Sequence, residues 1–149
     1  MTYKIPISVL VLVHTRHLDV LLLERADRPG FWQSITGSQE PGETLMQTAV
    51  RELQEETGLV AAPGAVADWR LQNEYEIFAR WRGRYAPGVT HNTEHVFAYT
   101  LEERLPVRLA PREHLQYAWV PWQEAAERVF SWSNAAAIRA LPDRAGRQP

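Results

Sequence analysis

The sequence predicts an α/β fold in which a mixed β-sheet is sandwiched between helices. Short runs rich in β-branched and aromatic residues occur along most of the chain, and other segments have the composition and periodicity of helices. Strands and helices do not alternate regularly, as they would in an all-parallel sheet. The chain has 149 residues, 45% of them apolar, which suits one domain with a sizeable core. We therefore expect a single domain over residues 1–149.

The first strands are expected near the start of the chain. The runs ISVLVLVH (7–14) and DVLLLER (19–25) are rich in β-formers and are separated by the polar TRHL. The segment WQSITG (32–37) predicts a third short strand, which leads into a loop at Gly37.

The second half of the chain predicts further strands followed by two helices. We expect one or two strands within 64–78, a loop over 79–92, and strands over 93–101 and 115–120. Helices are then expected over 121–130, opened by Pro121, and over 133–141. The polar tail after Pro142 is expected to fray.

Between the third strand and the later strands lies a helix with clear start and stop signals. Thr44 followed by Gln47 has the form of a capping box, and Gly58 stands where a left-handed residue ends a helix. Glu56 lies at one edge of the apolar stripe, with Glu52 just beyond it. The apolar residues expected to form the buried stripe are Leu45, Met46, Ala49, Val50 and Leu53.

Three carboxylates on this helix need an explanation. Glu52 and Glu56 are i,i+4 neighbours beside the core, while Glu55 points further out, and like charges at this spacing repel. A divalent cation would remove the penalty, because clustered carboxylates are the hard oxygen ligands that Mg²⁺, Mn²⁺ or Ca²⁺ prefers. The alternative is a solvated acidic face in which Arg51 pairs with Glu55.

The surroundings of these glutamates form a specific pattern. Gly37 is followed after five residues by Glu43, and after seven more by Arg51-Glu52-Leu53-x-Glu55-Glu56-x-Gly58-Leu59. Every fixed position of the Nudix box is thus present at residues 37–59, and the chain resembles the Nudix hydrolases.

This resemblance implies a Nudix α/β/α sandwich whose loop–helix–loop holds Mg²⁺, or Mn²⁺, against a pyrophosphate group. It implies Glu52 and Glu56 as the main metal ligands and Glu55 as a further catalytic carboxylate, with Arg51 orienting them. The cation would neutralise phosphate charge and lower the pKa of a water, which makes a nucleophile available near neutral pH.

Segments outside the box carry a more specific resemblance. FWQSITGS, EIFARWRGRYAPGVTHNTE, EHLQYAW and SWSN are similar to Nudix enzymes that convert dihydroneopterin triphosphate to the monophosphate and pyrophosphate in folate biosynthesis. The resemblance implies Glu113 as a third metal ligand or general base, and phosphate contacts by Lys4 and Arg25. In RWRGRY, the glycine and the weak basicity of the whole chain favour contact with a small anion, and Arg84 is the arginine expected to make it. The resemblance further implies substrate contacts by Thr36, Tyr75, Ile77, Phe78 and Ser131.

Simpler roles remain open for several of these residues. Glu113 could be a solvated residue, Arg25 could pair with Asp27, Ile77 could be ordinary strand packing, and Ser131 could cap a helix. The arginines of RWRGRY fit a phosphate clamp, an RNA-contacting loop or a solvated face. Among the tryptophans, we expect Trp32 and Trp132 near the pocket.

The composition of the chain argues against several classes of partner and of site chemistry. A net charge of −2 and a pI near 6.2 argue against a surface that wraps long nucleic acids. The absence of cysteine excludes disulfides, thiolate catalysis and cysteine-ligated zinc. The longest apolar run, IPISVLVLV, is too short to span a bilayer and lacks the flanks of a signal peptide. We expect a cytoplasmic monomer or weak dimer that acts on a small triphosphate, with no nucleic-acid or membrane partner.

The two enzyme hypotheses differ in the pocket that would bind the pterin or purine ring of the substrate. The leading hypothesis is hydrolysis of dihydroneopterin triphosphate, with dATP-like nucleotides as further substrates. The principal alternative is a housecleaning diphosphatase for oxidised purine nucleoside triphosphates. An RNA 5′-end hydrolase would need a more basic surface. A binding module on a degenerate scaffold is disfavoured by the intact set of Glu52, Glu55 and Glu56.

Overall fold

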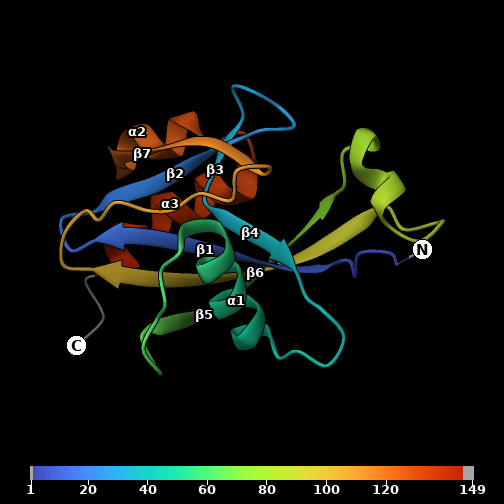
Figure 1. Cartoon of the computed structure of the whole chain (residues 1–149), viewed down its shortest axis with the longest axis horizontal. Helices are drawn as coiled ribbons and strands as arrows, with labels where there is room; N and C mark the ends of the chain where they lie inside the picture. Colours follow the sequence, from blue (N-terminus) through green and yellow to red (C-terminus); the bar gives the residue numbers. More distant parts are fainter. Residues whose placement is uncertain (1, 146–149) are drawn as a thin grey trace.

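The computed structural model describes residues 2–145, which form a helix–sheet–helix sandwich (Figure 1). The sheet is mixed and has seven strands: β1 (Ile7–Thr15), β2 (Asp19–Arg25), β3 (Trp32–Gln33), β4 (Ile35–Ser38), β5 (Val66–Glu76), β6 (His91–Leu101) and β7 (His114–Pro121). The helices are α1 (Leu45–Thr57), α2 (Trp122–Arg128), α3 (Trp132–Ala145) and the short 3₁₀ helix η1 (Ala79–Arg84). The predicted mixed sheet between helices is confirmed.

Strand β1 is the centre of the sheet. It pairs in parallel with β6 along its whole length, and antiparallel with β4 and β2. Because helices cover both faces of the sheet, β1 is buried at nearly every position, and its residues from Val9 to Val13 are all apolar instead of alternating. Leu10 and Leu12 face the core beneath α2 and α3, whereas Val9, Val11 and Val13 face the core beneath α1.

The predicted third strand is divided in two at Ser34. β3 pairs with β2, while β4 pairs with β1, so the chain crosses from one partner to the other at this residue. Ser34 is fully buried, and its polar groups are satisfied by Asn134 of α3. The Ser34 N–H donates to Asn134 Oδ1 (2.9 Å), and Asn134 Nδ2 donates to Ser34 Oγ (3.0 Å). A distant side chain thus makes the break possible.

The segments after α1 differ from expectation in detail. The stretch 64–78 contains one long strand, β5, which was one of the two expected arrangements, and it has a bulge between Asp68 and Leu71 where Arg70 adopts a φ of +53°. The expected loop over 79–92 contains η1 and the first residues of β6.

The expected fraying after Pro142 is wrong for the residues that the structure describes. Helix α3 continues through Pro142 to Ala145. Leu141 is fully buried, and the Arg144 guanidinium donates to the Trp69 carbonyl (2.8 Å) and lies over the Trp69 ring. These contacts hold the last turn despite the proline. The rest of the predicted tail, 146–149, lies outside the described residues.

Helix α1 begins and ends as predicted. Gln47 N–H donates to Thr44 Oγ1 (3.1 Å), and Thr44 N–H donates to Gln47 Oε1 (2.8 Å), which completes the capping box. Gly58 ends the helix with a φ of +76°. The expected burial of Met46 is wrong, since 37% of it is exposed. The buried arc also includes Glu52 and Glu56, so it is rotated away from Met46.

No helix within residues 2–145 combines the length and apolar character needed to cross a bilayer.

Candidate active site

A cavity of about 970 Å³ lies beside the carboxylates of α1. Trp132 lines it, as expected, but Trp32 does not. Trp32 packs in the core next to α2, where the Arg128 guanidinium lies 4.2 Å from its ring centroid. The cavity is lined by every site residue predicted from the sequence: Lys4, Arg25, Thr36, Arg51, Glu52, Glu55, Glu56, Tyr75, Ile77, Phe78, Arg84, Glu113 and Ser131.

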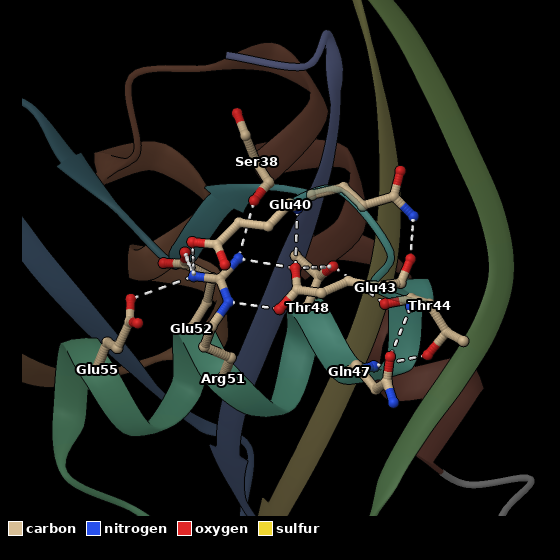
Figure 2. A network of polar contacts seen from close by, with 10 residues as sticks. Ser38, Glu40, Glu43, Thr44, Gln47, Thr48, Arg51, Glu52 and Glu55 are labelled. Atoms are coloured by element: carbon tan, nitrogen blue, oxygen red, sulfur yellow. Dashed lines mark hydrogen bonds and ion pairs between the residues drawn. The ribbon is translucent and has the colours of Figure 1, made fainter. Parts of the chain in front are cut away.

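Arg51 organises the acidic residues at the rim of the cavity (Figure 2). Its guanidinium donates two hydrogen bonds to the Glu43 carboxylate, from Nε (2.6 Å) and Nη2 (3.0 Å). Nη2 also donates to the Ser38 carbonyl (3.0 Å). Nη1 donates to Glu52 (2.5 Å) and Glu55 (3.2 Å). The paired guanidinium lowers the pKa of Glu43 to about 2. Arg51 therefore joins the loop before α1 to the carboxylates on the helix.

Gly37 allows Glu52 to reach the cavity. A Cβ atom at Gly37 would lie 2.1 Å from Glu52 Cδ, well inside van der Waals contact. The Glu52 carboxyl group thus passes directly over the backbone of β4, and only glycine leaves room for it there.

Glu56 is the most buried of these carboxylates, with 3% of its surface exposed. The Thr36 N–H donates to Glu56 Oε2 (3.2 Å), and His114 Nε2 lies 3.6 Å from Glu56 Oε1. Glu113 lies in the turn just before β7 and is exposed. Each of Glu56, Glu113 and His114 offers one ligand atom, and these atoms lie within 4.8 Å of one another.

This group differs in one member from the ligand set that the sequence implied. Glu52 is outside it and is hydrogen-bonded to Arg51, whereas His114 is inside it. Sequence reasoning missed His114, although its neighbour Glu113 was singled out. Because Glu52 and Glu56 stand on one ridge of α1 and line one cavity, a cation that competes with Arg51 for Glu52 would face both carboxylates.

Burial controls the protonation of Glu52, Glu56 and His114. It raises the pKa of Glu52 to about 7 and the pKa of Glu56 well above its usual value. Repulsion from Glu55 and Glu113 adds to the rise at Glu52, and repulsion from Glu52 and Glu113 adds to the rise at Glu56. Burial and the nearby Arg25 lower the pKa of His114 to about 4, so the imidazole is neutral at pH 7. Buried carboxylates and a neutral imidazole are chemically suited to hold a divalent cation, which would stabilise the ionised carboxylates.

Comparison with known proteins agrees with this geometry. The sequence profile of the NUDIX domain matches residues 4–141. The chain belongs to the Nudix family. Members of this family generally use divalent cations and act on small phosphorylated molecules.

Two curated relatives are similar over almost the whole Nudix domain. The chain is 45% identical to the dihydroneopterin triphosphate diphosphatase of Escherichia coli (strain K12), covering 91% of both chains. It is 43% identical to the enzyme of that name from Haemophilus influenzae, covering 93% of this chain and 89% of the relative. The solved structure of the E. coli dihydroneopterin triphosphate pyrophosphohydrolase superimposes with a TM-score of 0.89 at 42% identity, covering 95% of this chain and 97% of that one.

Beside the Nudix box, three basic side chains form a cationic group. Burial, together with the charges of Arg84 and Arg25, lowers the pKa of Lys4. Asp27 pairs with Arg25 (2.7 Å) and with Arg84 (3.3 Å), so the pairing of Arg25 with Asp27 considered above does occur. Both arginines and Lys4 still line the cavity, where they would attract an anionic ligand.

Aromatic side chains form one wall of the cavity. Phe78 is 44% exposed and stacks on Trp81 with ring centroids 5.2 Å apart, and Phe130 lies 6.1 Å from Phe78. Sequence reasoning missed Trp81, because RWRGRY was interpreted through its arginines, and it missed Phe130, because that residue was assigned to the helix expected over 121–130. Ile77, in contrast, is buried at the cavity edge, as in ordinary strand packing.

The polar residues Tyr75 and Ser131, which also line the cavity, were expected from the sequence, whereas Glu94 was not. The Tyr75 hydroxyl accepts a hydrogen bond from Asn92 Nδ2 (3.0 Å). Ser131 Oγ accepts from the Asn134 N–H (3.1 Å) at the start of α3, which supports its role as a helix cap. Glu94 of β6 is a buried carboxyl group that sequence reasoning missed, and burial raises its pKa to about 7. Only the pairing of β6 with β1 brings it to the cavity.

The raised pKa values predict how metal-free stability depends on pH. The folded-state pKa of Glu52, about 7, exceeds the ordinary value of 4.5, and that of Glu56 is also raised. Their stabilising contribution is complete below the unfolded value and is lost as pH rises through the folded value. We therefore expect this contribution to the melting temperature in EDTA to fall between about pH 5 and pH 8.

Mg²⁺ binds the ionised carboxylates, so the rise in melting temperature that it causes should be larger at pH 8 than at pH 5.5. Glu52→Gln should flatten the metal-free pH dependence and reduce the Mg²⁺ effect. Glu127→Gln removes the same charge from the exposed face of α2 and serves as the control. A melting temperature that does not change with millimolar Mg²⁺ at pH 8 would indicate a solvated acidic face instead of a metal site.

Proposed function

We propose that this Nudix domain hydrolyses dihydroneopterin triphosphate to the monophosphate and pyrophosphate, with Mg²⁺ as its preferred cation and Mn²⁺ as a substitute. The observation that carries the proposal is that buried carboxylates, three basic side chains and an aromatic wall line one cavity. A flat ring with a triphosphate chain needs each of these three surfaces. The similarity to enzymes named for this substrate supports the assignment.

One set of residues would bind the cation and orient its carboxylate ligands. Glu52, Glu56 and Glu113 would hold the cation with His114 beside them, and a bound cation supplies charge neutralisation and a lowered pKa for the attacking water. Arg51 fixes the direction of the carboxylates through Glu43 and Ser38. Glu55 lies at the exposed rim, where it can orient water or add a ligand.

Substrate binding falls to the remaining residues. Lys4, Arg25 and Arg84 would take the phosphates, and the Thr36 N–H holds Glu56 in place. The ring would lie against Phe78, within reach of Tyr75 and Ser131, with Ile77 shaping the edge of the cavity. Positioning and charge stabilisation then provide most of the reduction in the barrier. A cytoplasmic location and a monomeric or weakly dimeric state belong to the same proposal.

A substrate screen tests this function. Dihydroneopterin triphosphate, the four dNTPs and an oxidised guanine triphosphate should be compared by kcat/KM with and without Mg²⁺. We expect the pterin to rank first, dATP or another purine nucleotide next, and pyrimidines behind, because the larger rings cover more of the aromatic wall. An oxidised guanine nucleotide that surpasses the pterin by about tenfold or more, 1.4 kcal/mol in transition-state binding, would instead establish the housecleaning function.

A further inference from the structure

Two buried acceptor oxygens that line the cavity have no role in the chemistry described above. Glu94 Oε1 and Asn92 Oδ1 are both inaccessible to solvent and have no hydrogen-bond partner within residues 2–145. Glu94 is 4% exposed and Asn92 is 2% exposed. Both residues line the cavity that also holds the aromatic wall. A buried acceptor without a donor costs free energy, so two of them in one cavity indicate a ligand that supplies the donors.

Neighbouring groups fix the orientation of Asn92. Its side-chain nitrogen donates both to Ser8 Oγ (2.7 Å) and to the Tyr75 hydroxyl (3.0 Å). Both N–H groups of the amide are therefore used, and only its oxygen remains for a ligand. The amide cannot rotate to offer a donor without breaking these two hydrogen bonds.

Glu94 stands on the same face of β6 as Asn92, because alternate residues of a strand point to the same side. It lies opposite Ser8 of β1 in the sheet, and burial raises the pKa of its carboxyl group, an effect that Ser133 at the start of α3 partly opposes. The Oε1 atom of Glu94 is buried and has no hydrogen-bond partner within residues 2–145. The two oxygens that lack donors, on Glu94 and Asn92, form an acceptor pair on one side of the cavity.

We propose that Glu94, supported by Asn92, determines ring specificity by accepting hydrogen bonds from a ring edge that carries an amino group beside a ring N–H. This is the 2-amino-4-oxo edge that pterins and guanine share. The proposal rests on the proposed function in one respect, namely that the ring of a triphosphate substrate enters this cavity. It concerns the edge of the ring and does not require the pterin to be the best substrate.

The test uses dGTP and dITP, which differ only in the 2-amino group. We expect the unmodified protein to favour dGTP in kcat/KM by about tenfold or more, since loss of a donor leaves a buried acceptor without a partner. Glu94→Leu keeps a similar volume without an acceptor and should bring the ratio close to one. Glu94→Gln keeps one acceptor oxygen and should give an intermediate ratio.

Two measurements separate specificity from folding. The melting temperature and the inhibition constant of inorganic triphosphate, which has no ring, should stay close to the unmodified values in both variants. Thr93→Val changes the intervening residue of β6, whose side chain points to the other face, and should leave the dGTP/dITP ratio unchanged. If Glu94→Leu does not fold, Glu94→Gln decides, and it must lower the ratio.

An unmodified protein that treats dGTP and dITP alike would overturn the proposal, as would a folded Glu94 variant with an unchanged ratio. The outcome is independent of the substrate screen. A pterin that ranks below guanine nucleotides, together with a ratio that collapses in Glu94→Leu, would reject the proposed substrate and support the role of Glu94. A pterin that ranks first, together with a dGTP/dITP ratio that Glu94→Leu leaves unchanged, would support the proposed substrate and reject the role of Glu94.

Discussion

Glu56→Gln should lower kcat by at least about a hundredfold, the size of effect seen when one charge-stabilising group is removed from an active site. The variant should nevertheless be at least as stable as the original protein in EDTA. Glu56 is almost fully buried and its pKa is raised well above the ordinary value, so an uncharged amide removes a cost of burial. A gain in metal-free stability with a loss of turnover is expected if the charge serves turnover and not folding, and the Mg²⁺ dependence then tests whether it binds a cation.

The measurements are steady-state turnover over a range of Mg²⁺ concentrations and thermal melting in EDTA. The unmodified protein should have no turnover in EDTA and should recover when Mg²⁺ is added. Glu127→Gln again provides the control, because it removes one carboxylate from an exposed position on α2. Unaltered turnover in Glu56→Gln would refute the assignment of the metal site.

Glu113→Gln should raise the Mg²⁺ concentration needed for half-maximal activity by about tenfold or more, a range typical of groups that support a metal site. The structure favours this ligand role, because an oxygen of Glu113 lies within 4.8 Å of ligand atoms of Glu56 and His114. Hard cations take about six oxygen ligands, and α1 supplies them from one side only. Excess Mg²⁺ should therefore restore part of the activity.

A general base at Glu113 would give a different result. In that case kcat falls strongly, KM barely changes, excess Mg²⁺ does not restore activity, and the acidic limb of the pH–rate profile disappears. If kcat and the Mg²⁺ requirement are both unchanged, Glu113 is a solvated residue of the turn before β7.

The most local part of the structure was also the most predictable. Thr44, Gln47 and Gly58 begin and end α1 through contacts within one or two turns, so the sequence alone was sufficient to locate the helix. The strands were predicted well for the same reason, since runs of β-formers report directly on the local backbone. Errors occurred where distant contacts override local preference. Asn134 divides the third strand at Ser34, and the contacts of Arg144 with Trp69 extend α3 past Pro142.

The sequence by itself determined the family and the carboxylate helix, because the Nudix box is contiguous and its spacing specifies one face of one helix. It also indicated part of the cavity lining, but not His114, Trp81, Phe130 or Glu94. The tertiary structure alone decided how these groups are combined. It brought His114 to Glu56, assembled the aromatic wall from η1 and the segment before α3, and placed Glu94 between β1 and α3. These contacts join residues far apart in the chain through parallel pairing and packing. Burial, which raises the pKa of a carboxyl group and leaves an acceptor without a donor, exists only after the chain has folded.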